Sequence, residues 1–176
     1  MSCNGPFLGF HAAFLLVAIV GCGPGGEGDG AGAPAGGGAS VVLGTGREKF
    51  EALDSDGSVP LIKGIQGGFH VWTSFLAYGF TPDVLEMNLT TRWDMIDESV
   101  LEMHGSVAVK PVTDAVGNMA YAMLGWPASI FNPACSNGQG VQLDLTIVDV
   151  DGHSASDSRR WVVDVAEEDR SPDCAN

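Results

Sequence analysis

The sequence predicts an all-β fold, an antiparallel β-sandwich, and three observations lead to that prediction. Apolar and polar residues alternate along short segments, most clearly in residues 140–150, where Val141, Leu143 and Leu145 share one face. Gly, Asp and Pro residues separate these segments at intervals of about 8 to 15 residues. No segment carries a convincing apolar repeat of about 3.6 residues, and residues 93–105 come closest. We expect an immunoglobulin-like topology within this class.

Each expected strand rests on a local pattern. Residues 40–46 are a short β-branched run that glycines end, residues 48–53 alternate, and residues 54–57 predict a turn. Pro60, in the short run 59–64, fits an edge strand or a strand start. Residues 69–80 are apolar on both faces, which predicts a central strand. The remaining expected strands are residues 84–93, 99–112, 118–124, 127–131, 140–150 and 160–166, with a polar turn leading into the last.

Three segments of different composition divide the chain. Residues 1–21 contain an apolar run of about 14 residues, shorter than the roughly 20 that a membrane-spanning helix needs, and indicate a signal peptide. Residues 22–39 are almost entirely Gly, Ala and Pro with two acidic residues, which predicts a flexible tether. Residues 40–176 remain as one β-sandwich domain.

The residues before Cys22 resemble the lipobox of bacterial lipoproteins. Ile19 stands three residues before the cysteine and Gly21 directly before it. The resemblance implies cleavage before Cys22, a diacylglycerol on its thiol and an acylated amino terminus. Residues 1–11 hold no Lys or Arg, which departs from the usual basic start of such a signal. An ordinary secretory signal with an unmodified Cys22 is the alternative. Gly23 after the cysteine favours the outer membrane over the inner.

The net charge is strongly negative. The chain carries 22 acidic and 8 basic residues, a formal charge of −14. This balance repels phosphate backbones and excludes nucleic acid as a partner. It suits an extracytoplasmic surface or a partner that carries cations. The expected partners are the membrane, through the lipid anchor, and an envelope protein or a glycan.

Two cysteines would remain in the exported domain after Cys3 leaves with the signal and Cys22 takes the lipid. Cys135 and Cys174 predict a disulfide, because exported proteins lie in compartments where disulfides persist. A bridge would close a loop of about 40 residues and contribute on the order of 3 to 4 kcal/mol. Two free thiols or a metal pair are the rival interpretations.

Histidine offers one route to a metal site. His70, His104 and His153 lie in three separate segments and could bind zinc or iron only if the fold brought them together. His70 lies between Phe69 and Val71 in an expected strand, where a histidine that hydrogen-bonds a neighbouring turn is the commoner case. Both interpretations stay open.

Calcium is the other metal to consider. Residues 54–57 and 149–152 both read Asp-x-Asp-Gly, as at the start of an oxygen-ligand loop. Asp149, Asp151 and Asp157 form the best candidate group for Ca²⁺. The EF-hand pattern fails, because His153 takes the fifth position and Arg160 the twelfth. The alternative is a polar hairpin turn, in which Asp-Gly allows the backbone conformation of the turn. We prefer this alternative to a calcium site.

Other chemistry has little support in the sequence. The nucleophile motif Gly-x-Ser-x-Gly is absent, as is the Gly-Lys-Ser/Thr sequel of a phosphate-binding loop. The four tryptophans could form a stacking platform for a glycan, although core positions are the usual case in sandwiches: Trp72, Trp93, Trp126 and Trp161. No catalytic residue is predicted, and we expect the protein not to be an enzyme.

Residues 41–165 resemble a group of predicted lipoproteins from large-genome Gram-negative soil bacteria of the myxobacterial type. The shared stretches are LGTGREKFEAL, VPLIKGIQGGFHVW and VDVDGHSASDSRR, and the most specific piece is Gln66-Gly67-Gly68-x-His70. We interpret this motif as a structural turn into the strand that follows it. The resemblance implies location and architecture but no activity. We therefore expect a lipid-anchored binding or structural module of the cell envelope without a cofactor. A metal-dependent module is the alternative, either stabilised by Ca²⁺ or a small metalloenzyme that uses His70.

Overall fold

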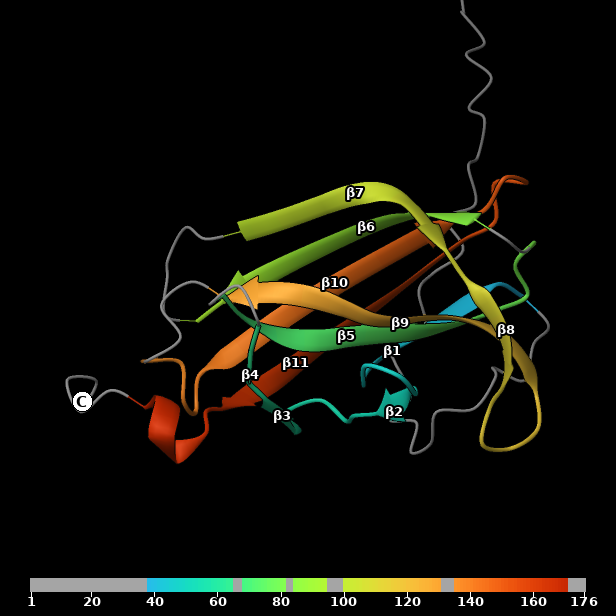
Figure 1. Ribbon diagram of the computed structural model, residues 1–176. Coiled ribbons are helices and arrows are strands. Elements are labelled where there is room, and N and C mark those ends of the chain that lie inside the picture. Colours follow the sequence, from blue (N-terminus) through green and yellow to red (C-terminus); the bar gives the residue numbers. More distant parts are fainter. Residues whose placement is uncertain (1–37, 65–67, 82–83, 95–99, 131–134, 171–176) are drawn as a thin grey trace, which may run out of the picture.

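The predicted all-β sandwich is confirmed by a computed structural model, which describes residues 38–64, 68–81, 84–94, 100–130 and 135–170 (Figure 1). Two sheets pack face to face, and nearly all of their pairings are antiparallel. The described ranges contain no α-helix; the 3₁₀ turn η2 covers Glu167–Asp169, and Cys135 also has 3₁₀ conformation. The immunoglobulin-like topology stays a prediction.

The first sheet has six strands within the described ranges, in the order β2-β1-β5-β9-β8, with β4 also paired to β5. Their bounds are β1 Ser40–Thr45, β2 Glu51–Ala52, β4 Ile62–Lys63, β5 Phe69–Tyr78, β8 Lys110–Thr113 and β9 Met119–Ile130. The strand expected from residues 69–80 is central, as predicted, because β1 and β9 flank it.

The second sheet has five strands in the order β3-β11-β10-β6-β7. Their bounds are β3 Ser58–Pro60, β6 Val84–Trp93, β7 Val100–Ala108, β10 Gly140–Val148 and β11 Ser154–Asp164. Pro60 lies in the edge strand β3, as its missing N–H requires. The β3–β11 pair is parallel.

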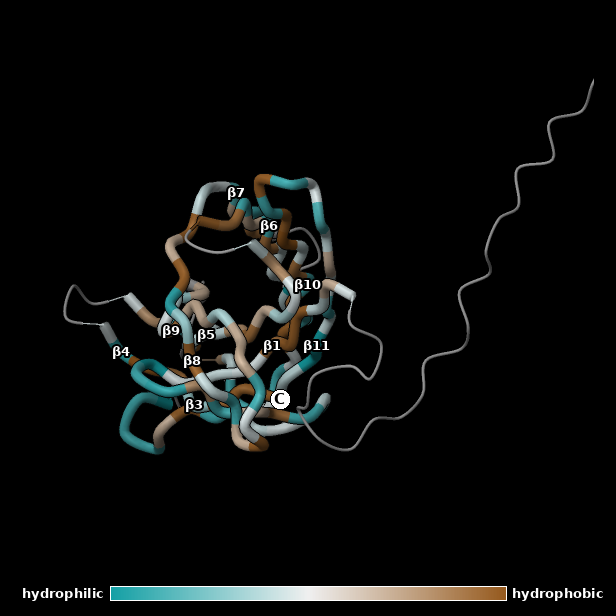
Figure 2. Tube along the Cα trace, turned by 90° about the vertical axis from the view of Figure 1, so that its right-hand side faces the viewer, coloured by the Kyte–Doolittle hydropathy of each residue, from teal (hydrophilic) through white to brown (hydrophobic). Residues whose placement is uncertain are grey.

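The main core lies between the two sheets. Figure 2 shows the chain trace of the two sheets, viewed from the strand ends. The alternation read from the sequence decides which side chains enter it. Leu143 and Leu145 of β10 and Leu89 of β6 are fully buried, whereas Gln142 and Asp144 lie on the outer face. Each buried aliphatic side chain of this kind contributes about 1.5–3 kcal/mol.

Four expected strands differ in their limits. Residues 118–124 and 127–131 were expected as separate strands, but the described part forms one long strand, β9. Residues 99–112 pass from the second sheet to the first, because the chain turns at the buried Val109 between β7 and β8. The last strand begins at Ser154 and not near 160, so the polar turn is only about five residues long.

The expected signal peptide, the lipidated Cys22 and almost the whole tether lie outside the described residues. Gly38 and Ala39 precede β1 directly, which fits a domain that starts near residue 40. The part of the chain that the structure describes contains no helix long and apolar enough to cross a bilayer. Cys174 also lies outside, so its pairing with Cys135 stays a prediction.

Candidate functional site

The described part of the Gln66-Gly67-Gly68-x-His70 motif leads into β5. Gln66 and Gly67 lie outside the described residues. Gly64 donates its N–H to the carbonyl of Gly68 at 2.7 Å, which joins these two glycines just before the strand. Gly64 also lies against the His70 ring, where a Cβ would be 3.5 Å from the ring atom Cε1. This geometry fits the structural interpretation of the motif.

His70 lies on the outer face of the first sheet, away from the core. Its ring meets that of Trp72 edge-on, with centroids 4.3 Å apart, and the Arg47 guanidinium lies 5.5 Å from the Trp72 ring centroid. Burial, and secondly the charge of Arg47, lower the pKa of His70, so the imidazole is neutral at neutral pH. Its Nε2 is buried and has no hydrogen-bond partner among the residues that the structure describes.

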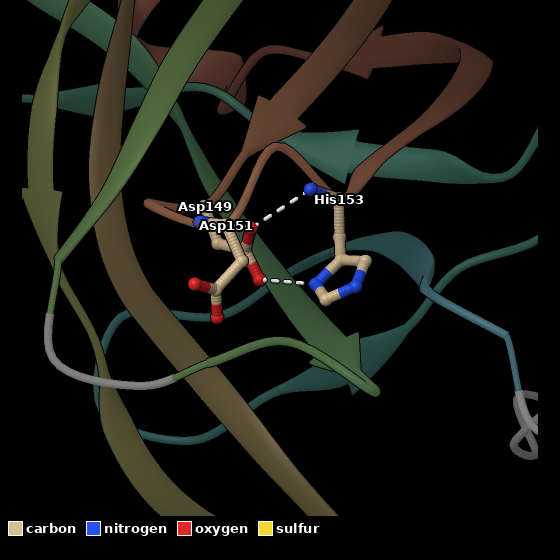
Figure 3. A group of neighbouring side chains, drawn as sticks. All are labelled: Asp149, Asp151 and His153. Atoms are coloured by element: carbon tan, nitrogen blue, oxygen red, sulfur yellow. Dashed lines mark hydrogen bonds and ion pairs between the residues drawn. The ribbon is translucent and has the colours of Figure 1, made fainter.

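The three histidines do not come together. His104 lies exposed on the edge strand β7 of the second sheet, 3.6 Å from Glu102, and His153 lies in the β10–β11 turn. Within the described ranges, one group of three side chains has the composition and spacing of a metal site: Asp149, Asp151 and His153 (Figure 3). Sequence reasoning placed Asp157 in this group and left out His153.

Hydrogen-bond donors of the protein occupy all acceptor positions of the Asp149 carboxylate. Its Oδ1 accepts the N–H groups of Asp151 and His153, at 3.0 and 2.8 Å. Its Oδ2 accepts the Thr81 N–H at 2.9 Å. The same oxygen pairs with His153 Nδ1 at 2.9 Å, as Figure 3 shows. Four donors fill the four lone-pair positions of a carboxylate. A cation bound to Asp149 would have to displace one of them.

Within this turn, the charge of Asp149 is balanced by His153. Burial opposes the ionisation of Asp149, but the hydrogen bonds from Thr81 and His153 outweigh it and lower the pKa of Asp149 to about 2. The hydrogen bond to Asp149 and then its charge raise the pKa of His153. This ion pair joins the two ends of the turn, and we call it the staple. It fits the hairpin-turn interpretation.

Asp157 has a different task. It faces inward from β11, opposite Leu145, and its Oδ2 accepts the N–H of Leu43 in β1 at 2.8 Å. Arg159 Nε donates to the same carboxylate at 3.0 Å. Asp157 thus joins the two sheets at one side of the sandwich and is not part of the turn.

A second turn repeats the geometry of the first, and sequence reasoning missed it. Residues 114–118, between β8 and β9, read Asp-Ala-Val-Gly-Asn, and residues 149–153 read Asp-Val-Asp-Gly-His. We call them the Asp114 turn and the Asp149 turn. In both, the Gly N–H donates to the Asp carbonyl, and the Asp N–H donates to the carbonyl of the fifth residue. The signal available in the sequence was the repeated Asp-x-x-Gly.

The Asp114 carboxylate also accepts four hydrogen bonds. The N–H groups of Val116 and Asn118 donate to Oδ1, at 3.0 and 2.8 Å. Asn118 Nδ2 and the Tyr78 hydroxyl donate to Oδ2, both at 3.1 Å. Burial opposes ionisation, but these hydrogen bonds prevail and lower the pKa of Asp114. Burial, together with Asp114, raises the pKa of Tyr78 to about 12, so the phenol stays a donor.

Residues 46–50 cross the outer face of the first sheet, and we call them the crossing segment. Ser74 Oγ of β5 donates to the Gly46 carbonyl at 2.5 Å and accepts the N–H of Gly125 at 3.0 Å. A Cβ at Gly125 would lie 2.6 Å from the Arg47 carbonyl oxygen, so only glycine lets the segment lie this close. The segment therefore separates the His70 end of the face from the Tyr78 end.

A pocket of about 460 Å³ lies beside the crossing segment, over the Tyr78 end of the first sheet. We call it the outer pocket. Its lining is Glu48, Lys49, Phe50, Ala52, Leu76, Val112, Thr113, Asp114, Ala115, Ala122 and Leu124. Leu76 and Ala122 form a floor that belongs to a second apolar cluster, separate from the main core, with Phe50 and Leu124 packed at its border.

The tryptophans do not share a surface. Trp161 and Trp93 are buried in the main core, as the commoner case for a sandwich predicts. Trp126 packs against that core, and its Nε1 lies 3.3 Å from the sulfur of Met103. Trp72 is half-buried under Arg47 on the outer face. A four-ring platform for a glycan is therefore not formed.

Comparisons with known proteins give no relative to reason from. The chain matches no protein-family model, no curated protein and no solved structure. The resemblance to predicted lipoproteins stays an expectation, and the function has to be argued from the site itself.

Proposed function

We propose that this chain is a binding module of the bacterial cell envelope, anchored by lipid at Cys22, whose β-sandwich holds a small ligand in the outer pocket. The observation that carries the proposal is the pocket: about 460 Å³, with an apolar floor and a few polar groups at its walls. Ligand sites of proteins are typically apolar clefts of about 300–1,000 Å³ with a few placed polar groups.

The opposite face of the molecule supports this choice by contrast. On the outer face of the second sheet, Asp144 accepts hydrogen bonds from Ser158 Oγ and Gln142 Nε2, at 2.6 and 3.1 Å, and pairs with Arg92. Such a face satisfies its own polar groups and suits contact with water. Among the described residues, the second apolar cluster, around Leu76, lies on the outer face of the first sheet.

Binding suits the pocket better than catalysis. No His or Cys is among the residues that line it, and its one strongly hydrogen-bonded carboxylate, Asp114, is held ionised by its donors. A general base needs a pKa near the working pH, and the pKa of Asp114 is moved the other way. A metal-dependent module is also less favoured, because the donors around Asp149 already fill its carboxylate.

The anchor has a direct test. Cys22→Ser should move the protein from the membrane fraction to the soluble fraction, because the thiol that carries the lipid is lost. Retention of the variant in the membrane fraction would refute the anchor without bearing on the pocket.

The pocket is tested with a neutral probe, n-decyl maltoside below its micelle concentration. Ala52 is exposed on the edge strand β2 and lines the pocket, so Ala52→Trp fills it without disturbing the main core. We expect the variant to bind the probe at least about tenfold more weakly, which corresponds to about 1.4 kcal/mol. Val84→Trp, on the second sheet and 44% exposed, is the matched control. Equal affinities in both variants and the native protein, measured by calorimetry, would contradict the pocket as the site.

A further inference from the structure

We propose that the ligand of the outer pocket is an amphiphilic cation, with its apolar body over Leu76 and Leu124 and its positive group beside Asp114. This inference rests on the proposed function, because it names the chemical class of ligand for the same pocket. Three features of the pocket carry it: an ionised carboxylate in one wall, the absence of a cation beside that carboxylate among the described residues, and the apolar floor.

The negative charge of Asp114 is fixed but not neutralised. All four of its donors are neutral groups: two backbone N–H groups, the Asn118 amide and the Tyr78 hydroxyl. Among the described residues no Lys, Arg or His forms an ion pair with Asp114, whereas Asp149 has His153. A full negative charge therefore stands in the pocket wall without a counter-ion from this part of the chain.

The other charged residues of the lining leave the net charge of the pocket negative. Glu48 and Lys49 are adjacent, exposed residues of the crossing segment and carry opposite charges. They offset each other at their side of the pocket, so Asp114 gives the lining its net negative charge. The whole chain, at −14, adds a field of the same sign and attracts cations.

The hydrogen bonds around Asp114 also narrow the type of cation. Since four donors occupy its oxygens, an incoming group gains little from N–H donors of its own and is held by charge. A tertiary or quaternary ammonium meets this condition, because it carries its charge with one N–H or none. The ring of Phe50 in the same lining offers such a cation a second favourable contact.

The apolar part of the ligand has a defined place. Leu76 and Ala122 are buried beneath the pocket, and Phe50, Val112 and Leu124 are half-buried around it. An alkyl or flat apolar body that covers them removes this surface from water, which favours binding in proportion to the apolar area covered.

The test compares three probes with the same alkyl chain and different head groups: n-decyltrimethylammonium, n-decyl maltoside and n-decyl sulfate, each below its micelle concentration. Calorimetry on the native protein should give the tightest binding for the cation and the weakest for the sulfate. Asp114→Asn should weaken binding of the cation about five- to tenfold and leave the maltoside within about twofold. Asp149→Asn makes the same change of net charge away from the pocket, and it should not alter either affinity.

A measurement on the native protein keeps the inference testable if Asp114→Asn does not fold. The N-methyl protons of the bound cation should show nuclear Overhauser effects to the backbone amides of Val116 and Asn118. Contacts of the head group elsewhere, or equal affinities for all three probes, would overturn the inference and leave the pocket in place. Failure of every probe to bind would overturn the proposed function as well.

Discussion

The Asp114 turn and the Asp149 turn share one hairpin geometry, but only in the second does the first aspartate have a counter-ion. Each starts with an aspartate that accepts the N–H groups of the residues two and four positions on. Each has a glycine at the fourth position with a positive φ, 94° at Gly117 and 84° at Gly152. Each also receives one donor from residues at or just after the end of β5, the Tyr78 hydroxyl or the Thr81 N–H.

The fifth residue makes the difference. Asn118 returns a neutral amide to its aspartate, whereas His153 returns an imidazole that can be protonated. Asp149 therefore has a counter-ion within its own turn, and the ion pair stabilises the turn. The Asp114 turn leaves an unbalanced anion beside an apolar pocket. Identical backbone chemistry can thus serve stability in one place and offer a binding group in another.

The shared backbone should respond equally to the same substitution. At Gly117 and Gly152 an added Cβ would have nothing within 4 Å, so alanine there meets no clash and suffers only from the positive φ. We expect Gly117→Ala and Gly152→Ala each to lower the free energy of unfolding by about 1–2 kcal/mol. Chemical denaturation with urea measures this.

Gly105 supplies the control for that pair. It lies in strand β7, is likewise open where a Cβ would be added and does not have a positive φ. Gly105→Ala should leave the stability unchanged or raise it slightly. A loss at Gly152 much larger than that at Gly117 would show that the two turns are not equivalent in their backbones.

The two turns should also differ in how their contribution to stability depends on pH, and this effect is smaller. The pKa of His153 is raised, so its ion pair stabilises the fold fully below the ordinary histidine pKa of about 6.5, and this contribution is lost as the pH rises through the raised value. The pKa of Asp149 is lowered to about 2, so its contribution is present above its ordinary value and is lost as the pH falls toward 2. The staple is therefore strongest between about pH 4 and 6.5.

His153→Asn should remove only the loss of stability at alkaline pH, because it gives the Asp149 turn the neutral fifth residue of the Asp114 turn. The quantity to measure is the difference in free energy of unfolding between native protein and variant, from pH 4 to 9, since the contribution of His70 cancels in it. A difference that does not change with pH would contradict the ion pair. For Asn118→Ala the difference should not change with pH.

Much of the fold could be predicted from the sequence, because strand alternation is local. The buried set around Leu143 and Leu145 and the central position of residues 69–80 followed directly from the pattern. The start of β11 did not. Its inward residues in the first half are Ala155, Asp157 and Arg159, so the apolar signal that marks a strand is missing there.

The candidate site was harder to predict because it depends on contacts between distant segments. The outer pocket exists because the crossing segment lies on Ser74 and Gly125, which are 51 residues apart in the chain. The pairing of His153 with Asp149 does not follow from ligand spacing, because a calcium loop favours carboxylates at these positions. The Asp114 turn contains a single acidic residue, so no cluster of charge marks it in the sequence.

The most direct test of the central claim is to determine which of the two turns a cationic probe binds. Native protein labelled with ¹⁵N is titrated with n-decyltrimethylammonium, and the amide shifts are followed residue by residue. The account predicts shifts at Leu76, Ala122, Leu124 and Val116, with the Asp149 turn unaffected. Shifts concentrated at residues 149–153, or spread evenly over the acidic surface, would contradict it.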